Sequence, residues 1–270
     1  MRRLSLLLLS LCACQARTPA TRRPPVEPPP ATTAPAATSR AFTRLGGPLR
    51  PAWFVCDGTN QPRLVVVERS AEGREVTLTV LDKTPGAAPV RHTYDLGEPD
   101  AGMQQRFYPL LRNGREAAAL RSLDPRALPD PSRSWIPPFL GVRLAEGPDL
   151  ACRFMEGVRL LGFDGRRSVL VTQDVQGRLT YRSFDFADAG RVEDTPVEGY
   201  GHTTAPASQT VEGGTEARTL DGASSTFTFQ NEGYRYVLRV GERASLEVWK
   251  GASSVQRTDL LAWTSAPPPT

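Results

Sequence analysis

The fold class is decided by a stretch in which apolar and polar residues alternate, Glu75-Val76-Thr77-Leu78-Thr79-Val80-Leu81. Side chains two residues apart point to the same side of an extended strand, so this pattern predicts a strand with one buried face. The preceding run, Arg63-Leu64-Val65-Val66-Val67-Glu68, is rich in β-branched residues and predicts a second strand. Between them, Ser70-Ala71-Glu72-Gly73 predicts a turn.

The same succession of short strands and turns continues along the chain. Asn113-Gly114 is a favoured two-residue hairpin turn. The best helical window, Arg115–Leu123, is short and is stopped by Pro125. Further strands are predicted at residues 158–163, 168–173, 178–186, 225–230, 234–240, 245–250 and about 255–263. The chain is therefore predicted to be all-β, an antiparallel meander that forms a sandwich or a barrel-like unit.

The β-rich region is expected to cover residues 41–265, with a short disordered tail at 266–270. Five prolines between residues 124 and 138 predict an irregular crossover, which would divide the region into halves at 41–123 and 139–265. The pattern leaves open whether the two halves share one core.

The N-terminal forty residues have a different composition. Met1-Arg2-Arg3 is positively charged, and the apolar run Leu4–Leu11 would rise roughly 12 Å as a helix, far short of the ~30 Å of a bilayer core. Such a run is typical of a secretory signal peptide, here residues 1–13. Residues 14–40 are rich in Pro, Ala and Thr and predict an extended, disordered linker.

The end of this apolar run, Leu11-Cys12-Ala13-Cys14, resembles the lipobox of bacterial lipoproteins. The resemblance implies that Cys14 becomes the N-terminal residue and carries fatty acyl chains, which would anchor the protein to a membrane. One alternative is that Cys12 is the lipidated cysteine. That choice places the bulky Leu11 immediately before the cysteine, where the lipobox has a small residue. Under the same resemblance, Gln15 implies sorting to the outer membrane. Whether the protein faces the periplasm or the cell surface is left open. The alternative is an ordinary signal peptide whose cysteines are incidental.

Export would determine the redox state of Cys56 and Cys152, the two cysteines of the β-rich region. An oxidising compartment favours a disulfide between them, which would link the two predicted halves. The alternative is two separate buried thiols.

Composition and motifs argue against several other functions. The formal net charge of +4 arises in the first forty residues, because 27 basic and 28 acidic residues remain from residue 41 onward. This balance gives no support to nucleic-acid binding. The two histidines, His92 and His202, and the lack of a Gly-x-Ser-x-Gly motif leave no recognisable catalytic set.

An acidic segment could suggest a cation site. It contains Asp185, Asp188, Asp194, Glu193 and Glu198, but their spacing differs from that of an EF-hand loop. We therefore expect neither a metal nor a cofactor.

Residues 53–113 resemble the membrane-bound inhibitors of C-type lysozyme, which are small all-β lipoproteins. The resemblance rests on Trp53-Phe54-Val55, Cys56-Asp57-Gly58, Val76–Val80, Tyr94-Asp95-Leu96, Ala101-Gly102 and Arg106-Phe107-Tyr108. It implies that a short loop around Ala101–Arg106 would enter the lysozyme cleft. The chain differs from the family in the insertion of Gln104-Gln105 and in having no lysine nearby.

Aromatic residues recur in the last third of the chain, often at alternate positions. They are Tyr181, Phe184, Phe186, Phe227, Phe229, Tyr234, Tyr236, Trp249 and Trp263. Alternate positions share a strand face, so we predict core packing, with an exposed glycan-binding surface as the alternative.

Together these features predict a non-enzymatic cell-envelope lipoprotein. Its β-rich domain would bind an envelope protein or a glycan, or would serve structurally. The alternatives are a lysozyme-inhibitor-like periplasmic protein and an envelope hydrolase whose site the sequence does not reveal.

Overall fold

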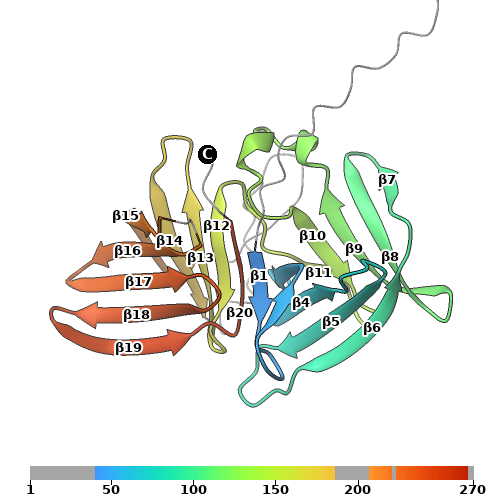
Figure 1. Ribbon diagram of the computed structural model, residues 1–270, viewed down its shortest axis with the longest axis horizontal. Helices are drawn as coiled ribbons and strands as arrows, with labels where there is room; N and C mark the ends of the chain where they lie inside the picture. Colours follow the sequence, from blue (N-terminus) through green and yellow to red (C-terminus); the bar gives the residue numbers. More distant parts are fainter. Residues whose placement is uncertain (1–39, 186–206, 221–222, 267–270) are drawn as a thin grey trace, which may run out of the picture. The chain divides into compact units, whose positions relative to one another are not determined.

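Two antiparallel sheets contain the named strands of the computed structural model, which describes residues 40–185, 207–220 and 223–266 (Figure 1). The all-β prediction is confirmed. The helical segments of the described residues are the 3-10 turns η1 (Pro125–Ala127) and η2 (Pro131–Arg133). Neither they nor any other described helix has the length and apolar character needed to span a bilayer.

The first sheet has nine strands and contains the stretch quoted first. Its spatial order is β11 (Leu150–Ala151), β10 (Phe139–Arg143), β9 (Arg115–Leu123), β8 (Gln105–Arg112), β6 (Val90–Leu96), β5 (Glu75–Asp82), β4 (Arg63–Arg69) and β3 (Phe54–Asp57), with β7 (Asp100–Gly102) beside β8. Asn113 and Gly114 join β8 to β9 with φ angles of 53° and 73°, as a two-residue hairpin of the predicted kind requires.

The second sheet has eleven strands and includes the start of the described chain. Its spatial order is β19 (Ser253–Asp259), β18 (Ala244–Lys250), β17 (Tyr234–Val240), β16 (Ser225–Asn231), β15 (Gln209–Arg218), β14 (Leu179–Asp185), β13 (Arg167–Gln173), β12 (Val158–Phe163), β20 (Ala262–Ser265), β1 (Arg40–Thr43) and β2 (Arg50–Ala52).

Strand β15 changes partner along its length, and this bends the eleven-stranded sheet. Residues 209–214 pair with β14, whereas residues 215–218 pair with β16. Gly213, just before this change of partner, has a φ of 76°, a left-handed conformation that glycine adopts without steric cost. Side chains from β12–β14 and from β16–β18 consequently meet in one core, which includes Tyr181, Phe229 and Trp263.

The apolar run of β4 is explained by burial on both of its faces. Val65 and Val67 face the core of the nine-stranded sheet, whereas Leu64 and Val66 pack against Phe163 and other residues of the eleven-stranded sheet. A strand covered on both faces needs apolar residues at consecutive positions, and alternation is lost there. Every residue of β12 is also buried, including Arg159, which pairs with Glu216.

The boundary between the sheets differs from the predicted halves. The Pro-rich segment 124–138 connects β9 to β10 within the nine-stranded sheet, and its Leu128, Trp135 and Ile136 pack against β12–β14. The chain instead passes between the sheets at residue 53 and at residues 152–157.

One strand boundary was wrong. The stretch 255–263 was predicted as a single strand, but it contains the end of β19 and the start of β20. At the break, the Leu260 amide donates to Ala244 O at 2.8 Å and the Leu261 amide donates to Phe163 O at 2.7 Å. The chain thus turns from the β18 side of the sheet to the β12 side.

Candidate functional site

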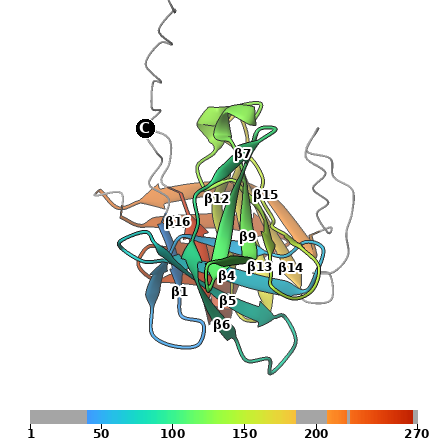
Figure 2. The same cartoon turned by 90° about the vertical axis from the view of Figure 1, so that its right-hand side faces the viewer.

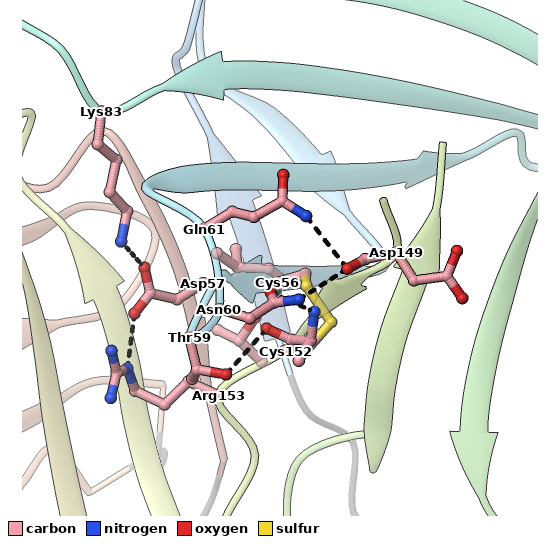
Figure 3. The surroundings of a disulfide bond; sticks show 12 residues. Cys56, Asp57, Thr59, Asn60, Gln61, Lys83, Asp149, Cys152 and Arg153 are labelled. Carbon is pink, nitrogen blue, oxygen red and sulfur yellow. Dashed lines mark hydrogen bonds and ion pairs between the residues drawn. A yellow bond between two sulfur atoms is a disulfide. The ribbon is translucent and has the colours of Figure 1, made fainter. Parts of the chain in front are cut away.

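A buried group of charged side chains lies where the two sheets meet. Asp57 ends β3, Lys83 follows β5, and Arg153 follows β11, all from the nine-stranded sheet. Ser168 comes from β13 of the eleven-stranded sheet. Each is at most 3% exposed, so the group is removed from solvent. We refer to these four residues as the Asp57 cluster, and Figure 3 shows Asp57, Lys83 and Arg153.

The carboxylate of Asp57 is the acceptor that all the other members share. Its Oδ2 accepts a hydrogen bond from Arg153 Nε at 2.7 Å, and its Oδ1 accepts one from Ser168 Oγ at 2.7 Å. Lys83 Nζ also donates to Oδ1 and lies 3.2 Å from Ser168 Oγ. Hydrogen bonds to an ionised carboxylate are stronger than those between neutral groups, so the cluster is tightly held.

Aromatic rings of the eleven-stranded sheet cover the two cations. The Arg153 guanidinium carbon lies 3.6 Å from the ring centre of Phe184, and Lys83 Nζ lies 5.9 Å from that of Phe163. Within the described residues, Arg153 Nη1 and Nη2 have no hydrogen-bond partner. The ring faces therefore supply part of the stabilisation that water would give an exposed cation.

The neighbouring backbone holds these side chains in register. The Arg153 amide donates to Asp57 O at 2.8 Å, and Gly58 and Cys152 form an isolated antiparallel bridge. The predicted disulfide between Cys56 and Cys152 is confirmed, with an S–S distance of 2.03 Å and a Cα–Cα distance of 4.8 Å. Each cysteine immediately precedes a charged member of the cluster, as Figure 3 shows.

The disulfide joins the two edges of one sheet. Cys56 belongs to the edge strand β3, and Cys152 follows β11 at the opposite edge. Thr59 N donates to Ala151 O at 2.9 Å in support of this closure. The nine-stranded sheet is thereby curled around its own core, in which Cys56 and Cys152 pack with Val65 and Leu150.

Burial and charge act on the protonation of the cluster in opposite ways. Burial raises the pKa of Asp57, but the charges of Lys83 and Arg153 and their hydrogen bonds together hold this pKa below its ordinary 3.8. Burial lowers the pKa of Lys83, against the attraction of Asp57, and the charge of Arg153 lowers it further. The surrounding cations therefore favour the ionised form of the Asp57 carboxylate.

This arrangement is suited to joining the sheets and is unsuited to turnover of a substrate. The oxygens of Asp57 are occupied by three donors, and the members of the cluster are closed to solvent. A general base must lie within hydrogen-bond reach of its substrate, and this closed cluster gives a substrate no access. We therefore assign the Asp57 cluster a structural role.

Met103, an apolar side chain, is 96% exposed at the tip of the β7–β8 hairpin. A hollow of about 530 Å³ lies beside it, lined by residues 101–106 and by Asp124, Arg126 and Ala127. Asp124 N donates to Gln104 O at 2.8 Å, which ties the hairpin to η1. Figure 2 shows β7 and the green helical turns at the same end of the structure.

Asp124 is the titratable carboxylate of this hollow. A side-chain hydrogen bond from Arg126 is the main cause that lowers its pKa to about 2. Arg126 Nη2 lies 2.7 Å and Arg106 Nη2 lies 3.7 Å from Asp124 Oδ2. The ion pairs account for the shift, so it does not indicate an acid–base catalyst.

The structure separates the other residues singled out in the sequence. His92 lies on β6, with its ring 6.4 Å from that of Tyr94. Asp185 ends β14, with Oδ1 at 3.6 Å from Arg167 Nε. Among the described residues, no group of three or more His, Cys, Asp or Glu side chains could hold a metal ion. Cys14, His202, Phe186 and the remaining acidic residues, Asp188, Glu193, Asp194 and Glu198, lie outside the described residues.

The aromatic residues of the last third are largely core, as predicted. Six of them are at most 8% exposed: Tyr181, Phe184, Phe227, Phe229, Tyr236 and Trp263. Tyr234 and Trp249 are partly exposed, and each has a cation over its ring, from Lys250 and Arg235 respectively.

The Asp57 cluster was missed at the level of sequence. A usable signal was present, because an acid follows one cysteine of the predicted disulfide and a base follows the other. Lys83 is also one of only two lysines in the chain.

The fold and the cluster define an all-β protein made of two antiparallel sheets that share a buried ionic junction. No protein-family model matches the chain, and no curated protein matches it. Among solved structures, the chain is similar to the β-propeller domain of the Trilobed protease from Pyrococcus furiosus, at 9% identity and a TM-score of 0.19 over 83% of this chain and 84% of that one. It is also similar to a protein of unknown function from the DUF3598 family of Nostoc punctiforme, at 11% identity and a TM-score of 0.13 over 85% and 93%. With TM-scores this low, neither likeness carries a conclusion about this chain.

Proposed function

We propose that this chain is a non-enzymatic lipoprotein of the bacterial cell envelope, whose β-rich domain binds a partner or serves structurally. The observation that carries the proposal is the buried Cys56–Cys152 disulfide. Structural disulfides of this kind form and persist in exported proteins. The apolar run and the lipobox-like Leu11–Cys14 supply the route of export and the anchor.

The anchor is assigned to Cys14, with the Pro-rich residues 15–40 as a spacer between the bilayer and the β-rich domain. Two or three acyl chains hold a protein firmly at a bilayer, whereas one chain binds only marginally. Under the resemblance to bacterial lipoproteins, Gln15 supports a location in the outer membrane.

Metabolic labelling with palmitate in a bacterial host tests this assignment. Wild type and Cys12→Ala should both incorporate label and sediment with the membranes. Cys14→Ala should lose the label and leave the membrane fraction. Equal labelling of wild type and Cys14→Ala would refute the lipid anchor.

Binding rather than catalysis is supported by the distribution of polar groups. The buried charges of the Asp57 cluster pair with one another, and the carboxylate at the Met103 hollow is held by arginines. The exposed features are hairpin tips and shallow hollows, which are suited to contact with a partner.

Inhibition of C-type lysozyme is the second candidate function. It is favoured by the position of Ala101–Arg106, because these residues form an exposed hairpin tip on the sheet closed by the disulfide. The full chain should protect bacterial cells in a lysozyme turbidity assay at micromolar concentration. Arg106→Glu should abolish the protection, whereas Arg243→Glu, at an exposed position of the other sheet, should not. Absence of protection by wild type would eliminate this function.

A further inference from the structure

We infer that the Cys56–Cys152 disulfide and the Asp57 cluster form one redox-dependent lock, in which oxidation of the cysteines assembles the junction between the two sheets. The inference concerns how the two sheets are coupled, and it does not depend on the lipid anchor or on any binding partner.

The first observation is the covalent adjacency of the two features. Cys56 precedes Asp57 and Cys152 precedes Arg153, so the disulfide places the carboxylate and the guanidinium in neighbouring backbone positions. The Arg153 amide then donates to Asp57 O at 2.8 Å, and Arg153 Nε reaches Asp57 Oδ2 at 2.7 Å. Joining the cysteines therefore also positions the ion pair.

The second observation is where Arg153 lies in the chain. Residues 152–157 lead from β11 of the nine-stranded sheet to β12 of the eleven-stranded sheet. The disulfide thus fixes the point at which the chain leaves the first sheet. Beyond that point, Ser168 and Phe184 of the second sheet contact Asp57 and Arg153.

The third observation is that each feature protects the other. Cys56 is 0% exposed and Cys152 is 3% exposed, so a reductant reaches the sulfurs only after the junction opens. Conversely, once the crosslink is broken, only hydrogen bonds and the ion pair hold β3 to the start of residues 152–157, so the two segments separate more readily. Separation would leave Arg153 without its ionic partner and Asp57 with Lys83 alone, and a buried charge that loses its partner is strongly destabilising.

The chemical step is a thiol–disulfide exchange. On oxidation, the two thiols lose two electrons and two protons to a disulfide of an exchange partner, which becomes two thiols. Reduction by dithiothreitol reverses the step, and the reagent becomes a cyclic disulfide. Local opening of the junction thus becomes measurable as the rate of reduction.

The experiment measures reduction of Cys56 and Cys152 in the folded full chain by excess dithiothreitol, quantified by alkylation and peptide mass spectrometry. Asp57→Asn should be reduced at least about tenfold faster than wild type, because removing the carboxylate lowers the free energy of local opening. The matched control is Glu247→Gln. Glu247 is also a buried carboxylate between two arginines, at 2.7 Å from Arg239 and 3.5 Å from Arg257, but on β18. The reduction rate of Glu247→Gln should stay within about twofold of that of wild type.

Hydrogen exchange of the wild type gives a second readout that needs no variant. Reduction should remove protection from β3, β12 and β13 while β16–β18 keep theirs. Equal reduction rates for wild type and Asp57→Asn would overturn the inference. So would unchanged protection of β13 after reduction, or loss of protection to the same extent throughout the chain.

Discussion

Ser168 Oγ donates a hydrogen bond to Asp57 Oδ1 at 2.7 Å, although the two residues are 111 positions apart and belong to different sheets. The carboxylate of Asp57 already pairs with Lys83 and Arg153. The hydrogen bond from Ser168 links it to the second half of the chain as well. Removing one partner from a buried carboxylate with several donors costs much of the free energy of unfolding, so the junction is sensitive to single substitutions.

Replacing Asp57 with Asn should destabilise the protein more than replacing Lys83 with Met. The first change leaves two buried cations facing each other, at a cost of about 3–5 kcal/mol in the free energy of unfolding. The second leaves Asp57 paired with Arg153 and should cost about 1–3 kcal/mol. Urea unfolding followed by tryptophan fluorescence measures both.

The other lysine of the chain provides the matched control. Lys250 Nζ lies 5.2 Å from the ring centre of Tyr234 on an exposed part of β18. Lys250→Met should cost no more than about 1 kcal/mol. An effect of Lys83→Met as small as that of Lys250→Met would contradict the importance of the Asp57 cluster.

Acid should weaken the wild type more than it weakens Asp57→Asn. The folded-state pKa of Asp57 lies below 3.8, so the stability it contributes is present above that pH and is lost as the pH falls through the folded value. Urea midpoints measured from about pH 5 down to about pH 2 should therefore fall less steeply for the variant. Parallel slopes for the two proteins would show that Asp57 keeps an ordinary pKa.

Gly58→Ala should disturb the closure of the nine-stranded sheet by steric overlap. A Cβ at Gly58 would lie 2.6 Å from Gln61 O and from Leu150 Cδ1, and 2.7 Å from Arg63 O. The expected cost is about 1–3 kcal/mol in the free energy of unfolding. Gly102→Ala is the control, because no atom lies within 4 Å of its added Cβ, and it should stay within about 0.5 kcal/mol of wild type. Similar values for both would contradict the close approach at Gly58.

Tyr181 should ionise later than a tyrosine exposed to water. Burial in the core of the eleven-stranded sheet is the main cause that raises its pKa to about 12. Alkaline titration followed by tyrosinate absorbance should show a step near that pH, and Tyr181→Phe should remove it. Because the folded pKa is raised above 10.0, the stability of the neutral form is lost as the pH rises towards 12. A late step that survives the substitution would belong to another tyrosine.

The strands with clear turns between them were predictable from the residues alone. Alternation in β5 and the two-residue turn after β8 reflect local rules, which act through side-chain direction and backbone φ angles. Arg115–Leu123 has a helical composition yet forms β9, because Ala118 and Leu120 pack into the core beside β8 and β10. Tertiary packing outweighs helix propensity there.

The break between β19 and β20 could not be seen in the pattern. Leu260 and Leu261 continue the apolar character of the stretch, while their amides bond to opposite parts of the sheet. A change of hydrogen-bonding partner leaves no trace in hydrophobic periodicity.

The disulfide was predictable from cysteine number and expected compartment, whereas the residues after the two cysteines indicate only the Asp57–Arg153 pair and not the rest of the cluster. Its members come from four separate segments, and Ser168 is an ordinary strand residue in the sequence. Closure of the nine-stranded sheet brings Asp57, Lys83 and Arg153 together, and the meeting of the two sheets adds Ser168. Both steps depend on long-range topology. The segment 124–138 was read as a boundary for the same reason, although it fills the space between the sheets.

Strand β1 is hydrogen-bonded to β20, with Arg40 opposite Ser265 and Thr43 opposite Ala262. β1, the first described strand, can therefore pair with β20 only after β20, the last strand, has been synthesised. A ribosome or a translocation pore releases residues in order, so this sheet can be completed only after more than two hundred further residues have emerged. Completion of the eleven-stranded sheet is thus a late event, and removal of residues 262–265 should leave β1 without β20, the strand that joins it to β12.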